Sequence, residues 1–169
     1  MTTIRCECGQ VEMAASGKPI LCVSCYCESC RTAGLAFERA GAEPLVQDDG
    51  GTPYVVYRKD RIAVRQGEQL LEEHRLDPAS FTRRVTAGCC GTPMYADFTK
   101  GFWLTVYRNR LAAPPPVAMR VMTADRTDET PLPDDLPNYR GHSGKFLLKL
   151  LATWVAMGFR TPRFPPATP

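Results

Sequence analysis

Residues 25–31 read Cys-Tyr-Cys-Glu-Ser-Cys-Arg and place three thiols within six consecutive positions. Side chains alternate along an extended chain, so Cys25 and Cys27 lie on one face, and a turn after Cys27 can bring Cys30 to the same point. Such convergence is typical of zinc sites, where every sulfur lies about 2.3 Å from one ion. Three ligands leave one position of a tetrahedral zinc unassigned, as in catalytic sites. The stretch therefore predicts a zinc centre with an open coordination position.

Two further cysteine groups lie on either side of this stretch. Near the N-terminus, Cys6 and Cys8 are separated by one residue and can share a face, and Gly9 permits a tight turn behind them. Later in the chain, Cys89 and Cys90 are adjacent and lie between two glycines. Adjacent side chains of an extended segment point in opposite directions, so both sulfurs can bind one metal only where the backbone turns sharply. Otherwise the two cysteines serve different metals, or one of them is a bystander.

The spacing of the eight cysteines in this chain of 169 residues favours metal over disulfides, which would link distant loops rather than form tight clusters. The first residues contain no apolar segment of a secretory signal, so we expect a cytoplasmic protein with reduced thiols. Cys22 has the opposite parity to Cys25 and Cys27 in its strand, and we expect it to pack in the core. Thiol redox chemistry is the alternative to metal, and it would need a pair of cysteines able to form a disulfide.

The composition is that of an ordinary globular domain, with 44% hydrophobic and 23% charged residues. The net charge of +3 is too small to argue for a nucleic-acid partner. Short β-forming runs separated by Gly and Pro dominate residues 1–111 and predict a mainly β domain without βαβ units. We expect a hairpin of residues 53–57 and 62–65, and a helical turn from Cys27 to about Ala33. The other expected strands cover residues 4–6, 11–13, 20–25, 70–76, 81–86 and 102–107.

The composition changes near residue 112, because ten of the fifteen prolines lie at position 114 or later. Residues 112–142 are therefore predicted to form an extended, Pro-rich arm. Residues 143–160 are predicted to form an amphipathic helix that Ser143 caps and Gly158 ends. This helix is too short to span a bilayer, and its apolar face is expected to pack on the core or on a partner, which allows a homodimer. The apolar residues of this face are Phe146, Leu147, Leu150, Leu151, Trp154 and Val155.

The cysteine pattern resembles the family of glutathione-dependent formaldehyde-activating enzymes and centromere protein V. That family has C-x-C-G near the start, then C-x-C-x-x-C-R followed by a glycine, then C-x-x-C-G-[ST]-P. The order and intervals match across residues 4–107, about 60% of the chain. The segment from Leu35 to Asp60 looks less like the enzyme's substrate loop and more like a divergent side branch that has a Cys-Cys pair. The matching positions are Cys6, Cys8 and Gly9, then Cys25, Cys27, Cys30, Arg31 and Gly34, then Cys90, Gly91, Thr92 and Pro93.

The resemblance implies a β-tent-like fold of small antiparallel sheets that binds one or two zinc ions. The structural zinc would take Cys6, Cys8 and Cys90, and the second, catalytic-type zinc would take Cys25, Cys27 and Cys30. One departure is that the family's first cysteine of the last pair falls on Ala87, so Cys89 is the natural substitute as the fourth structural ligand. Another is that Tyr26 stands where the family often has histidine.

The chemistry implied by the resemblance is carbon–sulfur bond formation or cleavage in an adduct of glutathione, or a similar small thiol, with an aldehyde such as formaldehyde. A zinc with three thiolates is a weak Lewis acid but holds a fourth sulfur well as thiolate. Tyr26, Ser29 and Arg31 are the candidate substrate-binding residues, and Glu28 and His74 are further candidates for proton transfer. The alternative is a non-catalytic binding module with structural zinc only, in which Cys89 could complete the second site.

Overall fold

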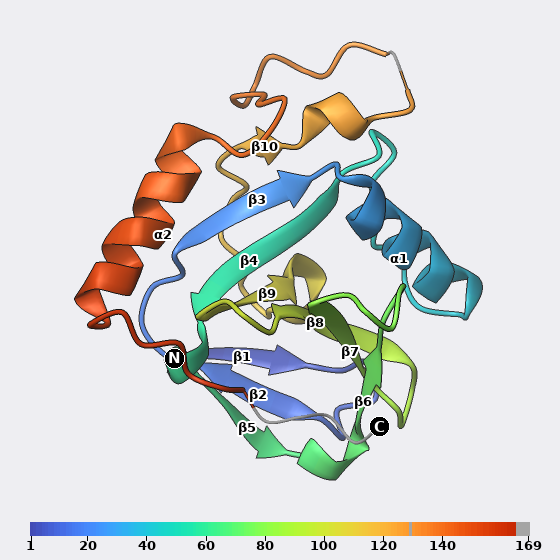
Figure 1. The fold of residues 1–169 in the computed structure, drawn as a ribbon. Helices are drawn as coiled ribbons and strands as arrows, with labels where there is room; N and C mark the ends of the chain where they lie inside the picture. The colour runs from blue at the N-terminus through green and yellow to red at the C-terminus, as the bar shows by residue number, and fades with distance from the viewer. Residues whose placement is uncertain (129, 165–169) are drawn as a thin grey trace.

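The computed structural model describes residues 1–128 and 130–164, which form two β-sheets and two α-helices (Figure 1). The smaller sheet has the order β1-β2-β5 and consists of β1 (Thr2–Arg5), β2 (Glu12–Ala15) and β5 (Ile62–Gln66). The larger sheet has the order β10-β3-β4-β9-β8-β7-β6. Its strands are β10 (Arg120–Val121), β3 (Leu21–Cys25), β4 (Thr52–Arg58), β9 (Trp103–Tyr107), β8 (Thr92–Phe98), β7 (Thr82–Ala87) and β6 (Leu71–His74). This architecture confirms the predicted mainly β fold.

The helices lie on opposite sides of the β3–β4 pair in Figure 1, with α1 (Glu28–Arg39) on one side and α2 (Gly144–Ala156) on the other. Four single turns of 3₁₀-helix, at Lys59–Arg61, Glu68–Leu70, Arg108–Arg110 and Thr123–Asp125, lie between strands or follow them. None of the described helices is long and apolar enough to cross a bilayer.

The main core lies between the two sheets and follows the two-residue period of the strands. Met13 of the smaller sheet and Val55, Val106 and Val85 of the larger sheet are fully buried in this cluster. Cys22 joins the same core with 4% of its surface exposed, as predicted from its parity. The opposite face of the larger sheet, which carries the alternate residues, is therefore free to build a site.

Three expectations about the elements need correction. The predicted hairpin is wrong, because β4 pairs with β3 and β9 whereas β5 pairs with β2 in the other sheet. The 3₁₀ turn Lys59–Arg61 passes the chain from one sheet to the other instead of reversing it within one. The helix after Cys27 extends to Arg39, beyond the single turn expected. Strands β8 and β10 were not expected, since β8 follows Gly91 and contains Pro93, and β10 lies in the predicted Pro-rich arm.

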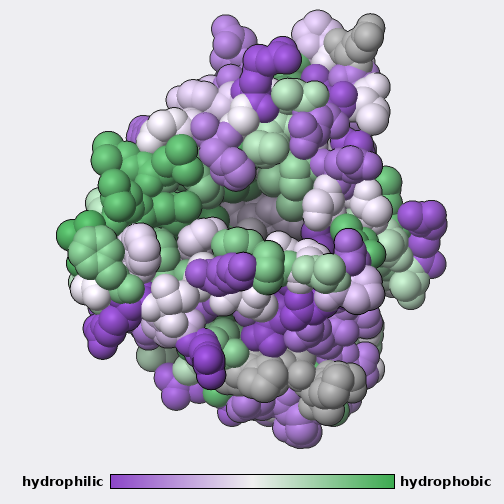
Figure 2. Space-filling view, viewed as in Figure 1, coloured by the Kyte–Doolittle hydropathy of each residue, from purple (hydrophilic) through white to green (hydrophobic). Residues whose placement is uncertain are grey.

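Helix α2 begins as predicted, because the Ser143 hydroxyl accepts a hydrogen bond from the Phe146 amide at 3.0 Å. It ends at Met157 and Gly158, where Gly158 adopts a positive φ of 62°. Phe146 packs with Met119 and Val121 in a second core cluster. Four other apolar side chains of the helix are about half exposed or more and contribute to the apolar surface over α2 in Figure 2: Leu147, Leu148, Leu151 and Val155. The homodimer through this helix stays a prediction.

We expect Ser143→Ala to lower the free energy of unfolding by about 1 kcal/mol, because it removes the N-cap acceptor of α2. The buried Ser143 hydroxyl also lies 3.3 Å from the Met119 sulfur, so both contacts are lost together. Urea unfolding followed by circular dichroism measures the change. Ser16→Ala is the control, since its hydroxyl makes only an exposed bond to the Arg61 carbonyl, and it is expected to change stability by less than about 0.5 kcal/mol. Equal costs for the two variants would contradict a capping role.

Candidate metal centres and the adjoining cavity

The outer cysteine cluster brings together two turns that are far apart in the sequence. Cys6 and Cys8 lie in the turn after β1, and Gly9 adopts the positive φ of 75° that this turn needs. Cys89 and Cys90 lie in the turn between β7 and β8, where the Cys90 and Gly91 amides donate to the Ala87 carbonyl at 3.1 and 2.8 Å. This is the sharp turn that two adjacent cysteines need if they are to point at one centre.

The four sulfurs of this cluster converge within 4.8 Å of one another. The distances are 3.6 Å for Cys6–Cys8, 3.9 Å for Cys6–Cys89, 3.3 Å for Cys8–Cys89 and 3.8 Å for Cys89–Cys90. Four sulfurs that each lie about 2.3 Å from a common zinc would be about 3.8 Å apart. All eight cysteines are free thiols. The outer cluster thus fits a tetrahedral metal ion with four thiolate ligands.

Hydrogen-bond donors contact two sulfurs of the outer cluster, and at Cys90 they favour the thiolate. The Val11 amide donates to the Cys6 sulfur at 3.2 Å, and the Thr92 hydroxyl lies 3.0 Å from the Cys90 sulfur. Burial raises the pKa of Cys90, but the Thr92 hydroxyl and the amides of Cys8 and Thr92 outweigh it and lower the pKa to about 6. A thiol that ionises readily suits a metal ligand.

The inner cluster consists of Cys25, Cys27 and Cys30, whose sulfurs also lie within 4.8 Å of one another. Cys25 ends β3, and Cys27 is the N-cap of α1, where its sulfur accepts from the Cys30 amide at 3.4 Å. Hydrogen bonds from the thiols of Cys25 and Cys30 lower the pKa of Cys27, and the positive charge of Arg84 acts in the same direction. Within the described chain, no fourth cysteine, histidine or carboxylate joins this cluster. Three thiols converge here, and the fourth side stays open for another ligand.

The sequence left open that Cys89 is the fourth ligand of the inner cluster. Its position excludes this, because Cys89 lies with Cys6 and Cys8 in the outer cluster. A cavity adjoins the inner cluster, and Ser29 lies on its wall. Tyr26 is fully buried instead, and its hydroxyl donates to Asp49 at 2.6 Å. Arg31 donates to the Asp125 carbonyl at 3.0 Å. Of the three candidate substrate-binding residues, only Ser29 is therefore among the lining residues of this cavity.

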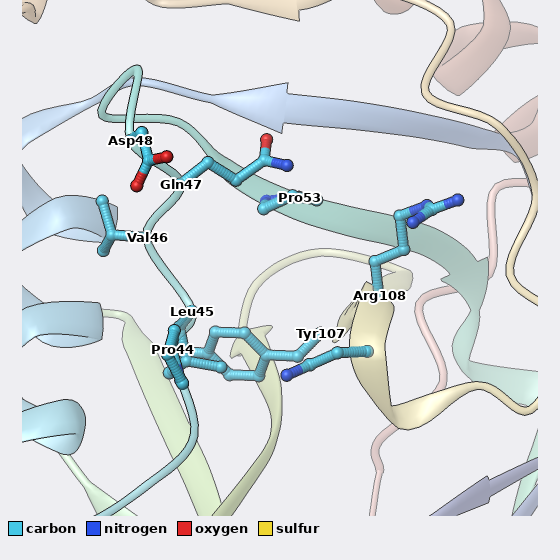
Figure 3. A pocket seen from close by; sticks show the side chains of 9 residues that line it. Pro44, Leu45, Val46, Gln47, Asp48, Pro53, Tyr107 and Arg108 are labelled. Atoms are coloured by element: carbon cyan, nitrogen blue, oxygen red, sulfur yellow. The ribbon is translucent and has the colours of Figure 1, made fainter.

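Two buried tyrosines pack against the inner cluster. Tyr54 and Tyr107 are each about 1% exposed, their rings lie 4.9 Å apart, and Cys30 packs against them. Burial raises the pKa of both hydroxyls, that of Tyr107 to about 12, so both stay protonated at neutral pH. Leu45, in the loop after α1, completes this layer. The loop also borders a separate surface pocket of about 360 Å³, lined by residues 44–48, Pro53 and residues 107–109, which contains no cysteine (Figure 3).

The cavity beside the inner cluster has a volume of about 410 Å³, and Cys25, Cys27 and Cys30 all lie on its wall. Figure 2 shows this side of the molecule, which is hollowed beside the apolar surface of α2. Seven of its sixteen lining residues are valine, alanine or aromatic residues of the larger sheet, and His142 and Phe146 near the start of α2 also line it. A concave apolar wall with a few polar groups is typical of a small-molecule site.

Arg84 supplies the permanent positive charge of this cavity. It is 3% exposed, and its guanidinium donates to the Ser29 carbonyl at 2.9 Å and to the Ser29 hydroxyl at 2.7 Å. Among the described residues its Nε has no hydrogen-bond partner, and its guanidinium bonds Ser29 rather than a carboxylate. A buried cation without a carboxylate is costly unless another negative group offsets it, and the thiolates of the inner cluster can do so.

The histidine that lines the cavity is His142 and not His74, the candidate for proton transfer. His74, the candidate for proton transfer, is exposed on β6, bonded to the Thr86 hydroxyl at 2.9 Å, and lies outside this cavity. His142, from the arm before α2, lines the cavity instead. Sequence reasoning missed Arg84, Tyr54 and His142 because nothing in a local pattern marks a strand or arm residue that long-range pairing brings to the cysteines.

Comparison with protein families agrees with the cysteine pattern. A comparison with curated proteins finds no match to the chain. Among solved structures, a crystal structure of a Rhodobacter sphaeroides protein matches with 18% sequence identity and a TM-score of 0.48, covering 68% of this chain and 91% of that one. The family model described as "Glutathione-dependent formaldehyde-activating enzyme" matches residues 1–108, which include both cysteine clusters. The chain therefore belongs to the glutathione-dependent formaldehyde-activating enzyme family.

Proposed function

We propose that the protein is a zinc-dependent carbon–sulfur lyase that forms or cleaves thiol–aldehyde adducts of the S-hydroxymethylglutathione type. The observation that carries this proposal is the three-thiol inner cluster on the wall of a 410 Å³ cavity. A structural zinc site needs four closed ligands, as the outer cluster offers, whereas a catalytic site keeps one position for substrate. The family to which the chain belongs supports a reaction that involves glutathione and formaldehyde.

The inner cluster would bind the substrate sulfur through its metal. Zinc on Cys25, Cys27 and Cys30 would supply a position that holds a substrate thiol as thiolate at neutral pH. In the direction of synthesis, the sulfur lone pair forms a bond to the carbonyl carbon, and the C=O electron pair moves to oxygen. That oxygen takes up one proton, and cleavage runs through the same steps in reverse.

The side chains on the cavity wall would stabilise the changing charge. Three thiolates on a divalent ion leave a net charge of about −1, which the buried Arg84 offsets. Arg84 lines the cavity, and its guanidinium charge would stabilise the oxygen as negative charge develops there. His142, an imidazole on the same wall, is suited to exchange the proton. Ser29 holds the guanidinium in place through two hydrogen bonds.

The test is exchange spectroscopy by NMR on zinc-loaded, full-length protein mixed with glutathione and formaldehyde. We expect the protein to accelerate exchange between free glutathione and S-hydroxymethylglutathione by at least about 100-fold, the scale of acid–base and electrostatic catalysis. Cys27→Ser is expected to abolish the acceleration, because it removes a ligand of the inner cluster. Cys22→Ser is the matched control, since Cys22 is a buried thiol outside both clusters.

Two results would overturn the proposal. One is the absence of any acceleration by protein that carries two zinc ions per chain. The other is an X-ray absorption spectrum in which both zinc ions have four protein sulfurs, which would favour the non-catalytic binding module.

A further inference from the structure

The cavity beside the inner cluster is built on the face of the larger sheet that the main core leaves free. Alternate residues of neighbouring strands line it because side chains of a strand share a face at every second position. Their partners of opposite parity, such as Val55 and Val106, point into the main core. The strand residues on the cavity wall are Val23, Cys25, Tyr54, Val56, Thr82, Arg84, Ala96, Phe98, Trp103, Thr105 and Val121. The face is thus apolar over most of its extent, and the cysteines lie towards one end of β3.

The C-terminal segment closes one side of this cavity. His142 and Phe146 belong to the wall, and their rings contact each other at 5.2 Å. Both lie beyond residue 108, where the match to the family model ends. Trp154, two turns further along α2, stacks on Phe102 at 6.2 Å, and Phe102 contacts the wall residue Trp103 at 5.1 Å. The segment that the family model does not cover therefore completes the cavity and braces its aromatic wall.

The cavity is much larger than the formaldehyde carbon requires. A water molecule has a share of liquid volume of about 30 Å³, so a hydroxymethyl group needs on the order of 60 Å³. The cavity has a volume of about 410 Å³. An apolar cavity of about 150 Å³ is already enough to hold benzene. The hydroxymethyl group of a formaldehyde adduct would leave most of the apolar wall in contact with water, whereas a larger apolar group would cover this wall.

The charges of the wall argue against placing the glutathione body in the same space. Glutathione carries two carboxylates and one ammonium group. Among the described wall residues, Arg84 and His142 are the only basic side chains, and no carboxylate is present to pair with an ammonium. The charged groups of glutathione are therefore expected to lie in solvent outside the cavity, and the cavity interior favours an uncharged, apolar group.

We propose that the aldehyde for which this site is built is apolar and larger than formaldehyde, with an aromatic or medium-length aliphatic side chain held in the 410 Å³ cavity. This inference rests on the proposed lyase function and names the substrate class of the same site. The bond changes are those given above, because the thiolate adds to the aldehyde carbon and the oxygen takes one proton whatever the side chain is.

The test compares two aldehydes and one unreactive probe on the zinc-loaded, full-length protein. We expect kcat/KM for the glutathione adduct of phenylacetaldehyde to exceed that for the formaldehyde adduct by at least about tenfold, since burial of an apolar ring contributes about 1.5 kcal/mol or more. Benzyl alcohol, which has no carbonyl group, should bind to the same cavity in a calorimetric titration. This second readout does not depend on turnover.

Cavity-filling variants locate the effect. Ala96→Phe on β8 places a ring in the cavity and should abolish benzyl alcohol binding and lower the preference for phenylacetaldehyde at least tenfold. Thr105→Phe on β9 is a second variant with the same expected result, should the first fail to fold. Ala63→Phe is the matched control, because Ala63 is exposed on β5 in the other sheet, and both readouts should stay at the wild-type level.

The failures of the two proposals are distinguishable. Exchange of the formaldehyde adduct without preference for phenylacetaldehyde, together with no benzyl alcohol binding, would overturn the apolar-aldehyde inference and leave the lyase function standing. Absence of exchange with every aldehyde would overturn the lyase function, and the aldehyde inference with it. Benzyl alcohol binding that Ala63→Phe removes as fully as Ala96→Phe would show that the probe does not occupy this cavity, and this too overturns the inference.

Discussion

Replacement of Cys89 by alanine is expected to reduce the zinc content from two ions per chain to one and to lower the melting temperature sharply. The Cys89 sulfur lies 3.3 Å from that of Cys8 and 3.9 Å from that of Cys6, so it occupies one corner of the outer cluster. The cluster joins the turn after β1 to the β7–β8 turn and thereby ties the smaller sheet to the larger one. Loss of a structural metal belongs to the mechanisms that cost more than about 4 kcal/mol.

For a chain of this length, such a loss corresponds to a decrease in melting temperature of about 8–16 °C. Inductively coupled plasma spectrometry gives the zinc content, and differential scanning calorimetry gives the melting temperature. Cys22→Ala is the matched control, because it also removes a thiol from the chain but leaves both clusters intact, and it should keep two zinc ions and cost about 1 kcal/mol. If Cys89→Ala behaved like Cys22→Ala, Cys89 would be a bystander.

The placement of Cys89 shows which part of the site could be predicted from the sequence. The period-two rule correctly pairs Cys25 with Cys27 and separates Cys22 from them, because all three lie on one strand and its continuation. The same rule alone leaves adjacent Cys89 and Cys90 ambiguous. The ambiguity is resolved by the turn at Ala87–Gly91, whose backbone hydrogen bonds bend the chain enough for both sulfurs to face Cys6 and Cys8.

The residues that could not be predicted are those that the topology of the sheets brings to the site. At Lys59–Arg61 the chain passes from β4 to the other sheet. In the sequence this segment looks like a hairpin turn, since a hairpin turn and a crossing between sheets can both be short and polar. Arg84 reaches the inner cluster only because β7 lies in the same sheet as β3. His142 reaches it because β10 pairs in parallel with β3 and turns the arm back over the sheet. Local patterns carry no information about such pairings.

A second large effect is expected at Asp97, a buried carboxylate on β8 between the cavity residues Ala96 and Phe98. It lies 2.8 Å from Lys59 Nζ and 2.8 Å from Arg83 Nε, and the three side chains are 1–7% exposed. Glu73 approaches the other side of Arg83 at 3.1 Å. Asp97 therefore balances two buried cations at the point where the Lys59–Arg61 turn meets the β7–β8 pair.

Asp97→Asn is expected to lower the free energy of unfolding by about 3–5 kcal/mol, because it leaves Lys59 buried without its carboxylate and takes from Arg83 one of the carboxylates that it contacts. In this chain the melting temperature should fall by about 6–20 °C. Asp60→Asn is the matched control: it breaks the 2.6 Å pair with Arg58, whose side chains are 22% and 30% exposed, and should cost less than about 1 kcal/mol. Equal costs for the two variants would contradict the role of Asp97.

The double variant Lys59→Met/Asp97→Asn separates the cost of an unpaired charge from the value of the ion pair itself. Methionine replaces Lys59 by an uncharged side chain of similar length, so the loss of Asp97 then leaves no unpaired ammonium group at position 59. We therefore expect the double variant to be more stable than the sum of the two single changes predicts. Urea unfolding of the four proteins gives a coupling energy that should reach about 1–3 kcal/mol, since contacting residues couple on this scale. Strict additivity would mean that Lys59 and Asp97 contribute independently, and it would contradict a stabilising ion pair between them.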